Sequence, residues 1–114
     1  MKNFSEFWPF YLQEHIHPVN RRMHFIGTLL AIITLAWGMV AFDWRCFFIA
    51  PLIGYGFAWC GHFVFQKNKP ATFKYPGWSF VGDFKMFGLI ASGRMDAEIE
   101  RLELDESEAA KIKK

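Results

Sequence analysis

Two long apolar runs dominate the hydropathy pattern of the chain. Residues 25–42 give 18 positions without a charge, and residues 46–65 give 20 more without a formal charge. Each run is close to the roughly 20 residues that a helix needs to cross about 30 Å of hydrocarbon. Only Asp43, Trp44 and Arg45 separate them, which predicts an antiparallel helical hairpin. The alternative is two buried helices in a soluble bundle, which we disfavour because a chain of 114 residues cannot cover both on all sides.

Small residues recur on one face of each predicted span, where they would let the two backbones approach closely. They are Gly27, Ala31, Thr34 and Gly38 in the first span and Gly54, Ala58 and Gly61 in the second. His24 extends the first stripe by one turn, and His62 lies beside the second. Counted from Trp44, the two histidines lie 20 and 18 residues away, a difference of about 3 Å in depth. The hairpin is therefore expected to bring His24 and His62 together.

An amphipathic helix is predicted before the hairpin, from Asn3 to about His17. Asn3 and Glu6 have the spacing of a helix-capping box. One face is aromatic and ends in a histidine, formed by Phe4, Trp8, Tyr11 and His15. Such a face suits a helix in the membrane interface. Pro18 is expected to break this helix, and Asn20 to cap the next one.

The segment after the hairpin is predicted to lie on the membrane rather than cross it. Residues 79–91 are too few to span, and they place Phe80, Phe84 and Phe87 on one face, which suits an interfacial or re-entrant helix. Residues 94–114 hold seven acidic and five basic side chains and are expected to form a marginal helix that frays into disorder. We divide the chain into a membrane-embedded domain, residues 1–93, and an acidic, partly disordered tail, residues 94–114.

Composition and charge support an all-α integral membrane protein. Aromatic residues make up 19% of the chain, more rings than a small soluble domain can bury. The net charge of +2 neither indicates nor excludes nucleic acid, and we expect membrane lipids rather than nucleic acid as partners. Basic residues flank the outer ends of the hairpin and only Arg45 lies in its turn, which predicts both termini in the cytoplasm. The membrane would be the inner membrane of a bacterium or the endoplasmic reticulum of a eukaryote.

Four histidines gather near the predicted cytoplasmic face. They are His15, His17, His24 and His62. Histidine at the end of a single span is more often only an interfacial polar residue, but several at one depth indicate a functional site. The chain has no zincin motif and no cysteine-pair ligand set. Four histidines are too few for the large histidine sets of di-iron membrane hydroxylases, so the pattern favours a single metal ion.

Two carboxylates are expected on the same face as the histidines, Glu14 and Asp83, whereas Asp43 lies at the opposite end of the hairpin. Imidazole and carboxylate ligands with an open position are typical of non-haem Fe(II) oxygenases. Glu14 and His17 are possible additional ligands. His17 is the weaker one, because two residues from His15 it points off that helix face.

Arg21 and Arg22 can be interpreted in two ways. They could bind phospholipid head groups or clamp a substrate carboxylate, for which the guanidinium is well shaped. Two non-catalytic alternatives also stay open for the whole chain. One is a lipid-binding or scaffold protein whose histidines only satisfy polar interfaces, and the other is a scaffold that holds zinc structurally.

Four motifs follow one another over residues 4–86. They are Glu14-His15-x-x-Pro18-x-Asn20-Arg21-x-x-His24-x-x-Gly27-Thr28, Gly54-Tyr55-Gly56-x-Ala58-Trp59-x-Gly61-His62-Phe63, Asn68-x-Pro70-Ala71-Thr72-Phe73, and Trp78-Ser79 followed by Asp83. In this order they resemble the membrane 2-hydroxy fatty acid dioxygenases, a family long catalogued as a domain of unknown function. The short chain is similar to the bacterial-style members.

This resemblance implies an Fe(II)-dependent α-oxidation, in which a 2-hydroxy long-chain fatty acid reacts with O₂ and loses one carbon. It implies that the iron ligands are His15, His24 and His62. We expect Arg21, Arg22 and Asp83 to serve catalysis, the arginines by supplying charge near the substrate head. The chain departs from the family at Gln66, where a glutamate is frequent, so this position cannot supply an anionic ligand.

Overall fold

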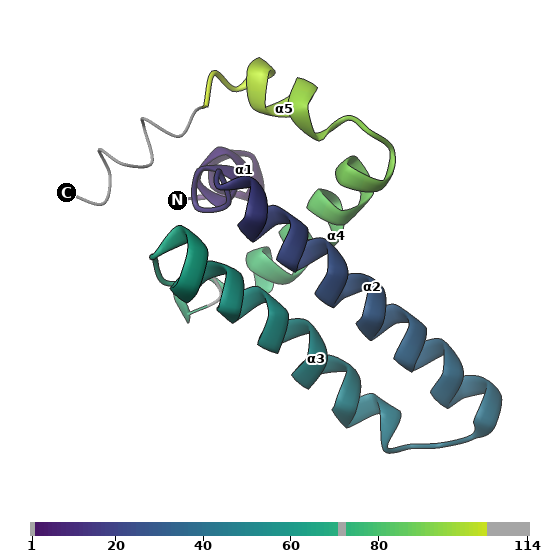
Figure 1. The fold of residues 1–114 in the computed structure, drawn as a ribbon. Coiled ribbons are helices and arrows are strands. Elements are labelled where there is room, and N and C mark those ends of the chain that lie inside the picture. The colour runs from purple at the N-terminus through teal and green to yellow at the C-terminus, as the bar shows by residue number, and fades with distance from the viewer. Residues whose placement is uncertain (1, 71–72, 105–114) are drawn as a thin grey trace.

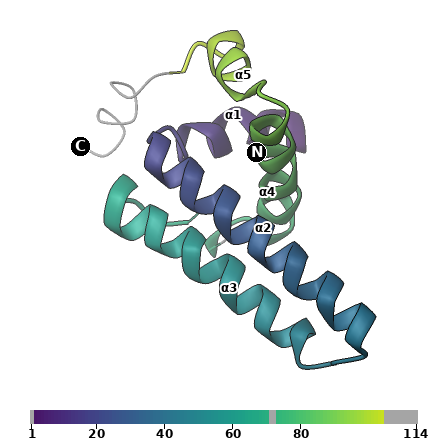
Figure 2. The same cartoon turned by 45° about the vertical axis from the view of Figure 1, so that its right-hand side comes forward.

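The protein is all-helical, as predicted. The computed structural model describes residues 2–70 and 73–104, which contain helices and no strand (Figure 1). In chain order the elements are α1 (Phe4–Gln13), α2 (Pro18–Ala41), α3 (Cys46–Cys60), the π-helical turn η1 (Gly61–Gln66), α4 (Pro76–Ala91) and α5 (Met95–Arg101). In Figures 1 and 2, α1, α4 and α5 gather at one end of the α2–α3 pair, and its turn projects alone at the other end.

Helices α2 and α3 form the predicted antiparallel hairpin (Figure 2). The turn is closed by Asp43, whose carboxylate accepts hydrogen bonds from the backbone and the guanidinium of Arg45. Both α2 and the continuous α3–η1 helix are long and apolar enough to cross a membrane. Only 17% and 22% of their most apolar stretches are buried within the protein. The exposed apolar surface is compatible with insertion in a bilayer.

Small residues line the contact between the two helices, as predicted. A Cβ atom added at Gly27 would lie 2.6 Å from the Cβ atom of Phe57, and one at Gly54 would lie 3.7 Å from that of Ala31. Nearer the turn, Gly38 packs against Cys46 in the same way. The backbones therefore approach where a larger side chain would hold them apart.

Helix α1 is covered by protein, which corrects the prediction that its aromatic face contacts the membrane interface. Asn3 caps the helix as expected, accepting a hydrogen bond from Glu6 N at 2.9 Å. The residues Phe7, Trp8 and Tyr11 are at most 3% exposed, in one cluster with Met86 of α4. The rings are buried because the chain returns after the hairpin and lays α4 across them (Figure 1).

The start of α2 also differs from the prediction. His17 rather than Asn20 caps the helix, its Nδ1 accepting a hydrogen bond from Val19 N at 3.1 Å. Pro18 begins the helix, a position where its missing N–H costs nothing. The prediction for Asn20 was wrong: this residue lies inside α2 and is fully buried.

The tail is partly folded onto the core. Met95 is buried, and Ile99 and Leu102 pack against the α1–α4 cluster. Trp8 Nε1 donates a hydrogen bond of 2.8 Å to Glu98, which ties α5 to α1. The predicted marginal helix is thus α5, whereas the disorder predicted for the end of the tail concerns residues 105–114, outside the described residues.

Candidate metal centre

Three imidazoles meet where α1, α2 and η1 come together. His15 lies in the turn after α1, His24 in α2 and His62 in η1, and each is at most 6% exposed. The Nε2 atom of His15 lies 3.0 Å from that of His24 and 2.8 Å from that of His62. The predicted pairing of His24 and His62 is confirmed, with ring centroids 5.1 Å apart.

The outer nitrogens of two of these rings are held by hydrogen-bond acceptors. His15 Nδ1 lies 2.7 Å from the backbone oxygen of Tyr11, and His62 Nδ1 lies 2.7 Å from Asn68 Oδ1. The amide of Asn68 is oriented by Glu14, because its Nδ2 donates to the Glu14 backbone oxygen and carboxylate. Since a carbonyl oxygen only accepts, both Nδ1 atoms carry the proton, and both Nε2 lone pairs face the centre of the cluster.

Asp83 stands behind the third ring. Its Oδ1 lies 3.7 Å from His24 Nδ1 and accepts a hydrogen bond from the Tyr11 hydroxyl. Burial raises the pKa of Asp83 to about 6, although the Tyr11 hydrogen bond acts in the opposite direction. Burial, together with the Asp83 charge, also raises the pKa of Tyr11. The Tyr11–Asp83–His24 chain connects α1, α4 and α2 beside the cluster.

The three-histidine group fits a metal ion. Lone pairs that face one another at these distances repel unless a cation or a proton lies between them. Between His15 and His62, whose Nδ1 atoms already carry protons, a further proton is disfavoured, because burial and the neighbouring His24 and His62 lower the pKa of His15 well below its usual value. Two nitrogens bonded to one ion at right angles, each at roughly 2.1 Å, would lie about 3 Å apart. Imidazole ligands suit zinc, copper, iron and nickel, so the group could hold a metal ion but does not select among these.

The other predicted ligands lie outside this group. His17 caps α2 and its ring is 6.4 Å from that of Phe65. The carboxylate of Glu14 contacts Asn68, and that of Asp83 faces the outer nitrogen of His24. The metal group found in the described residues is thus made of imidazoles alone.

The two predicted arginines lie apart from the three inner nitrogens. Arg21 Nη1 donates hydrogen bonds to the backbone oxygens of His15, at 3.2 Å, and Ile16, at 2.6 Å. Arg22 is exposed and lines a pocket with Arg21 that contains none of the three histidines. Arg21 therefore supports the turn that carries His15.

Three amides around the cluster were not predicted as functional. Asn20 and Gln66 are at most 2% exposed, and Asn68 holds His62. Gln66 Oε1 accepts hydrogen bonds from His17 N at 2.8 Å and Asn20 Nδ2 at 3.4 Å. Gln66, the position at which the sequence departs from the motifs it resembles, thus holds the α1–α2 turn against η1. Buried amides beside predicted metal ligands are the signal that could have identified them.

An apolar groove of about 160 Å³ begins at the cluster. His24 and Asp83 line its polar end, and it runs between α2, α3 and α4 to Leu35 and Pro51. The distance from residue 24 to residue 35 along a helix is about 16 Å. The groove is therefore a narrow apolar space whose polar end lies at His24 and Asp83.

Comparison with known proteins gives one family. A family model described as "2-hydroxy-palmitic acid dioxygenase Mpo1-like" matches residues 1–95, which include the three histidines, Asp83 and helices α1 to α4. A search of curated proteins and of solved structures found no match. Because this match covers most of the chain, including the motifs that contain the three histidines, the chain belongs to the Mpo1-like family.

Proposed function

We propose that the protein is an Fe(II)-dependent dioxygenase that shortens 2-hydroxy long-chain fatty acids by one carbon. The observation that carries this proposal is a buried cluster of three imidazole nitrogens at the polar end of an apolar groove. A 2-hydroxy fatty acid has the matching form, a small polar head on a long apolar tail. The name of the family points to the same substrate class.

His15, His24 and His62 would hold the iron through their Nε2 atoms. When bound, the iron would supply the redox and Lewis-acid chemistry that O₂ requires. The Tyr11 backbone and the Asn68 amide keep two of the imidazoles turned inward. Burial of all three rings keeps bulk water away from the head of the substrate.

The substrate tail would lie in the groove with its 2-hydroxy carboxylate beside His24. Asp83, which lies at this end of the groove and accepts a hydrogen bond from the Tyr11 hydroxyl, would accept the proton of the 2-hydroxyl group. In the overall reaction, one 2-hydroxy acid and one O₂ would give the acid one carbon shorter, one CO₂ and one water. The clamp on the substrate carboxylate by Arg21 or Arg22 stays a prediction, because both line a different pocket.

The protein would carry out this reaction while embedded in a membrane, with both termini on the cytoplasmic side. Two helices of sufficient length and apolar composition support this placement. The groove lies between the same two helices and α4, so a fatty acid could enter it from the lipid without crossing water.

The test is purification in detergent without oxygen, followed by metal analysis and by incubation with 2-hydroxyhexadecanoate and O₂. We expect one iron per chain, consumption of the acid, and formation of pentadecanoate. His24→Ala and His62→Ala should abolish both iron binding and turnover. His17→Asn is the matched control, because asparagine keeps the cap on α2 and His17 lies outside the cluster.

Each rival gives a different result in this experiment. A structural zinc protein would contain zinc and would not convert the acid. A lipid-binding scaffold would contain no stoichiometric metal and would tolerate His24→Gln. Full iron binding or full turnover in both alanine variants would refute the proposal.

A further inference from the structure

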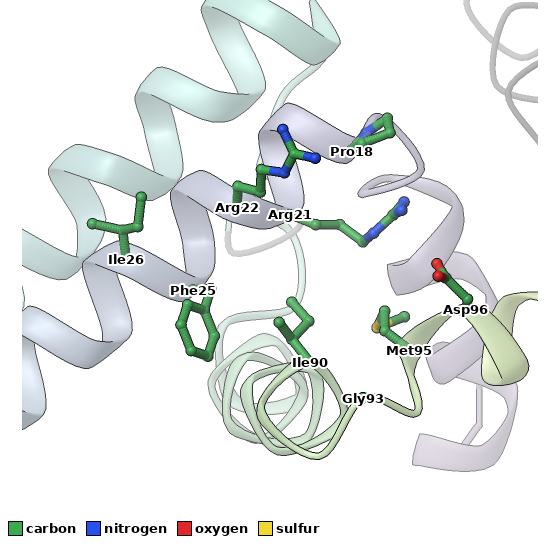
Figure 3. A pocket seen from close by; sticks show the side chains of 9 residues that line it. All are labelled: Pro18, Arg21, Arg22, Phe25, Ile26, Ile90, Gly93, Met95 and Asp96. Atoms are coloured by element: carbon green, nitrogen blue, oxygen red, sulfur yellow. The ribbon is translucent and has the colours of Figure 1, made fainter.

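A second pocket lies between α2, α4 and α5, with a volume of about 590 Å³ (Figure 3). This volume is within the range of about 300–1,000 Å³ that is usual for small-molecule sites. None of the three histidines lines it. The pocket is therefore separate from the candidate metal centre and from the groove that begins there.

The pocket has a polar part and an apolar part. Figure 3 shows Arg21, Arg22 and Asp96 toward one end, and Phe25 and Ile90 facing one another toward the other. Phe25 begins the apolar run of α2, and its ring stacks on that of Phe87 in α4 at a centroid distance of 4.8 Å. The polar part thus lies where the candidate membrane span begins.

Two of the three charged side chains in this polar part have no charged or hydrogen-bonding partner among the described residues. Arg22 and Asp96 form no ion pair and no side-chain hydrogen bond within residues 2–70 and 73–104. Arg21 is held in place by the backbone oxygens of His15 and Ile16. The exposed guanidinium group of Arg22 suits a phosphate, since it can donate two parallel hydrogen bonds, and Arg21 adds a second positive charge to the same pocket.

The carboxylate of Asp96 narrows the choice of head group. It would repel a purely anionic lipid but attract a cation bonded to the same phosphate. An ammonium group two carbons away from the phosphate meets this requirement. The combination of two arginines and one aspartate therefore favours a zwitterionic phosphoethanolamine over an anionic head group.

We propose that this pocket binds phosphatidylethanolamine. Its phosphate would contact Arg21 and Arg22, its ammonium would contact Asp96, and its acyl chains would follow Phe25 and Ile26 along α2. Basic pockets beside membrane spans are a recognised type of lipid head-group site. The proposal requires neither a bound metal nor catalytic activity.

The test uses the full chain, purified in detergent and incubated with equal amounts of phosphatidylethanolamine and phosphatidylglycerol. Bound lipid is then counted by native mass spectrometry. The wild-type protein should retain mainly phosphatidylethanolamine. Arg22→Gln should lower retention of both lipids about fivefold, and Asp96→Asn should abolish the preference for phosphatidylethanolamine. Lys69→Gln, which removes the same charge outside the pocket, should behave like the wild type.

Equal retention of the two lipids by the wild-type protein would overturn the proposal, as would unchanged retention in Arg22→Gln. A raised KM for a 2-hydroxy fatty acid in Arg22→Gln, with lipid binding unchanged, would overturn it in favour of the carboxylate clamp. Metal content measured on the same samples separates this proposal from that of the dioxygenase, because a protein without metal can still retain the lipid.

Discussion

His15 Nε2 and His62 Nε2 lie 2.8 Å apart although 47 residues separate them in the chain. Between them the chain crosses the length of the hairpin and returns. The ring of His15 is held by the backbone of α1, whereas that of His62 depends on residues outside its own helix, since Asn68 holds His62 and Glu14 holds Asn68. The geometry of the cluster therefore depends on contacts that surround it as much as on the histidines.

Removing the Asn68 amide should weaken metal binding. In Asn68→Ala the Nδ1 proton of His62 loses its acceptor at 2.7 Å, and the ring is no longer held in one orientation. Loss of such a partner typically lowers metal affinity about 10- to 100-fold. Competition with a chelator under anaerobic conditions measures the change. Lys69→Ala is the control, and an affinity within about twofold of the wild type in Asn68→Ala would contradict the role assigned to this amide.

A methyl group at Gly27 should separate the hairpin helices. The added Cβ atom would lie 2.6 Å from the Cβ atom of Phe57, and overpacking of this kind costs about 1–3 kcal/mol. A Cβ atom added at Gly56 would have no other atom within 4 Å. Gly56→Ala should therefore be neutral or stabilising by up to about 1 kcal/mol. Thermal unfolding in detergent compares the two variants, and equal melting temperatures would show that the close contact at Gly27 is absent.

Blocking the far end of the groove should shorten the substrates that the protein accepts. Leu35 lines this end, and Leu35→Trp would fill the space that the proposed function assigns to the last methylenes of a long tail. Each methylene excluded from the groove costs about 0.8 kcal/mol, or roughly fourfold in affinity. Turnover of 2-hydroxyhexadecanoate should fall while that of 2-hydroxyoctanoate stays the same. Ile33→Trp, at a position that is 54% exposed, is the control, and an equal loss for both acids in Leu35→Trp would exclude this position for the tail.

Acid should release α5 from α1. Hydrogen bonds from Arg101 and Trp8 lower the pKa of Glu98 to about 2, below its ordinary value of 4.5. Because the folded-state pKa is depressed, this carboxylate stabilises the contact above pH 4.5, and the stabilisation is lost as the pH falls toward 2. Cleavage of α5 by pepsin should therefore increase over this range. Glu98→Gln should be cleaved readily already at pH 5, whereas the exposed Glu100→Gln should follow the wild type; identical profiles for all three would contradict the prediction.

The part of the fold that follows local rules could be predicted from the sequence. Counting residues from Trp44 was enough to pair His24 with His62, because an α-helix has a fixed rise and the hairpin turn is short. The partner of an amphipathic face could not be predicted in this way. The rings of Phe7 and Tyr11 could contact lipid or α4 equally well until the path of the chain after Gln66 is known.

The amides of the site escaped prediction for a related reason. Asn20 belongs to a residue type that often caps helices, and its actual role depends on Glu14 and Gln66, which come close only in the folded chain. The π-helical geometry of η1 has no clear signal in its sequence either. Local pattern thus located the ligand candidates, and long-range contacts determine how the rings are oriented.

The short turn at Asp43 and Arg45 has a consequence for the order in which this protein assembles. The two candidate spans are adjacent in the chain and contact each other directly, so they can pair before the other helices arrive. His15 reaches the cluster only when α1 docks, and α1 is covered only when α4 has been synthesised. The three histidines therefore meet only after the hairpin has formed and α1 has docked on it, so metal loading would report that α1 is in place.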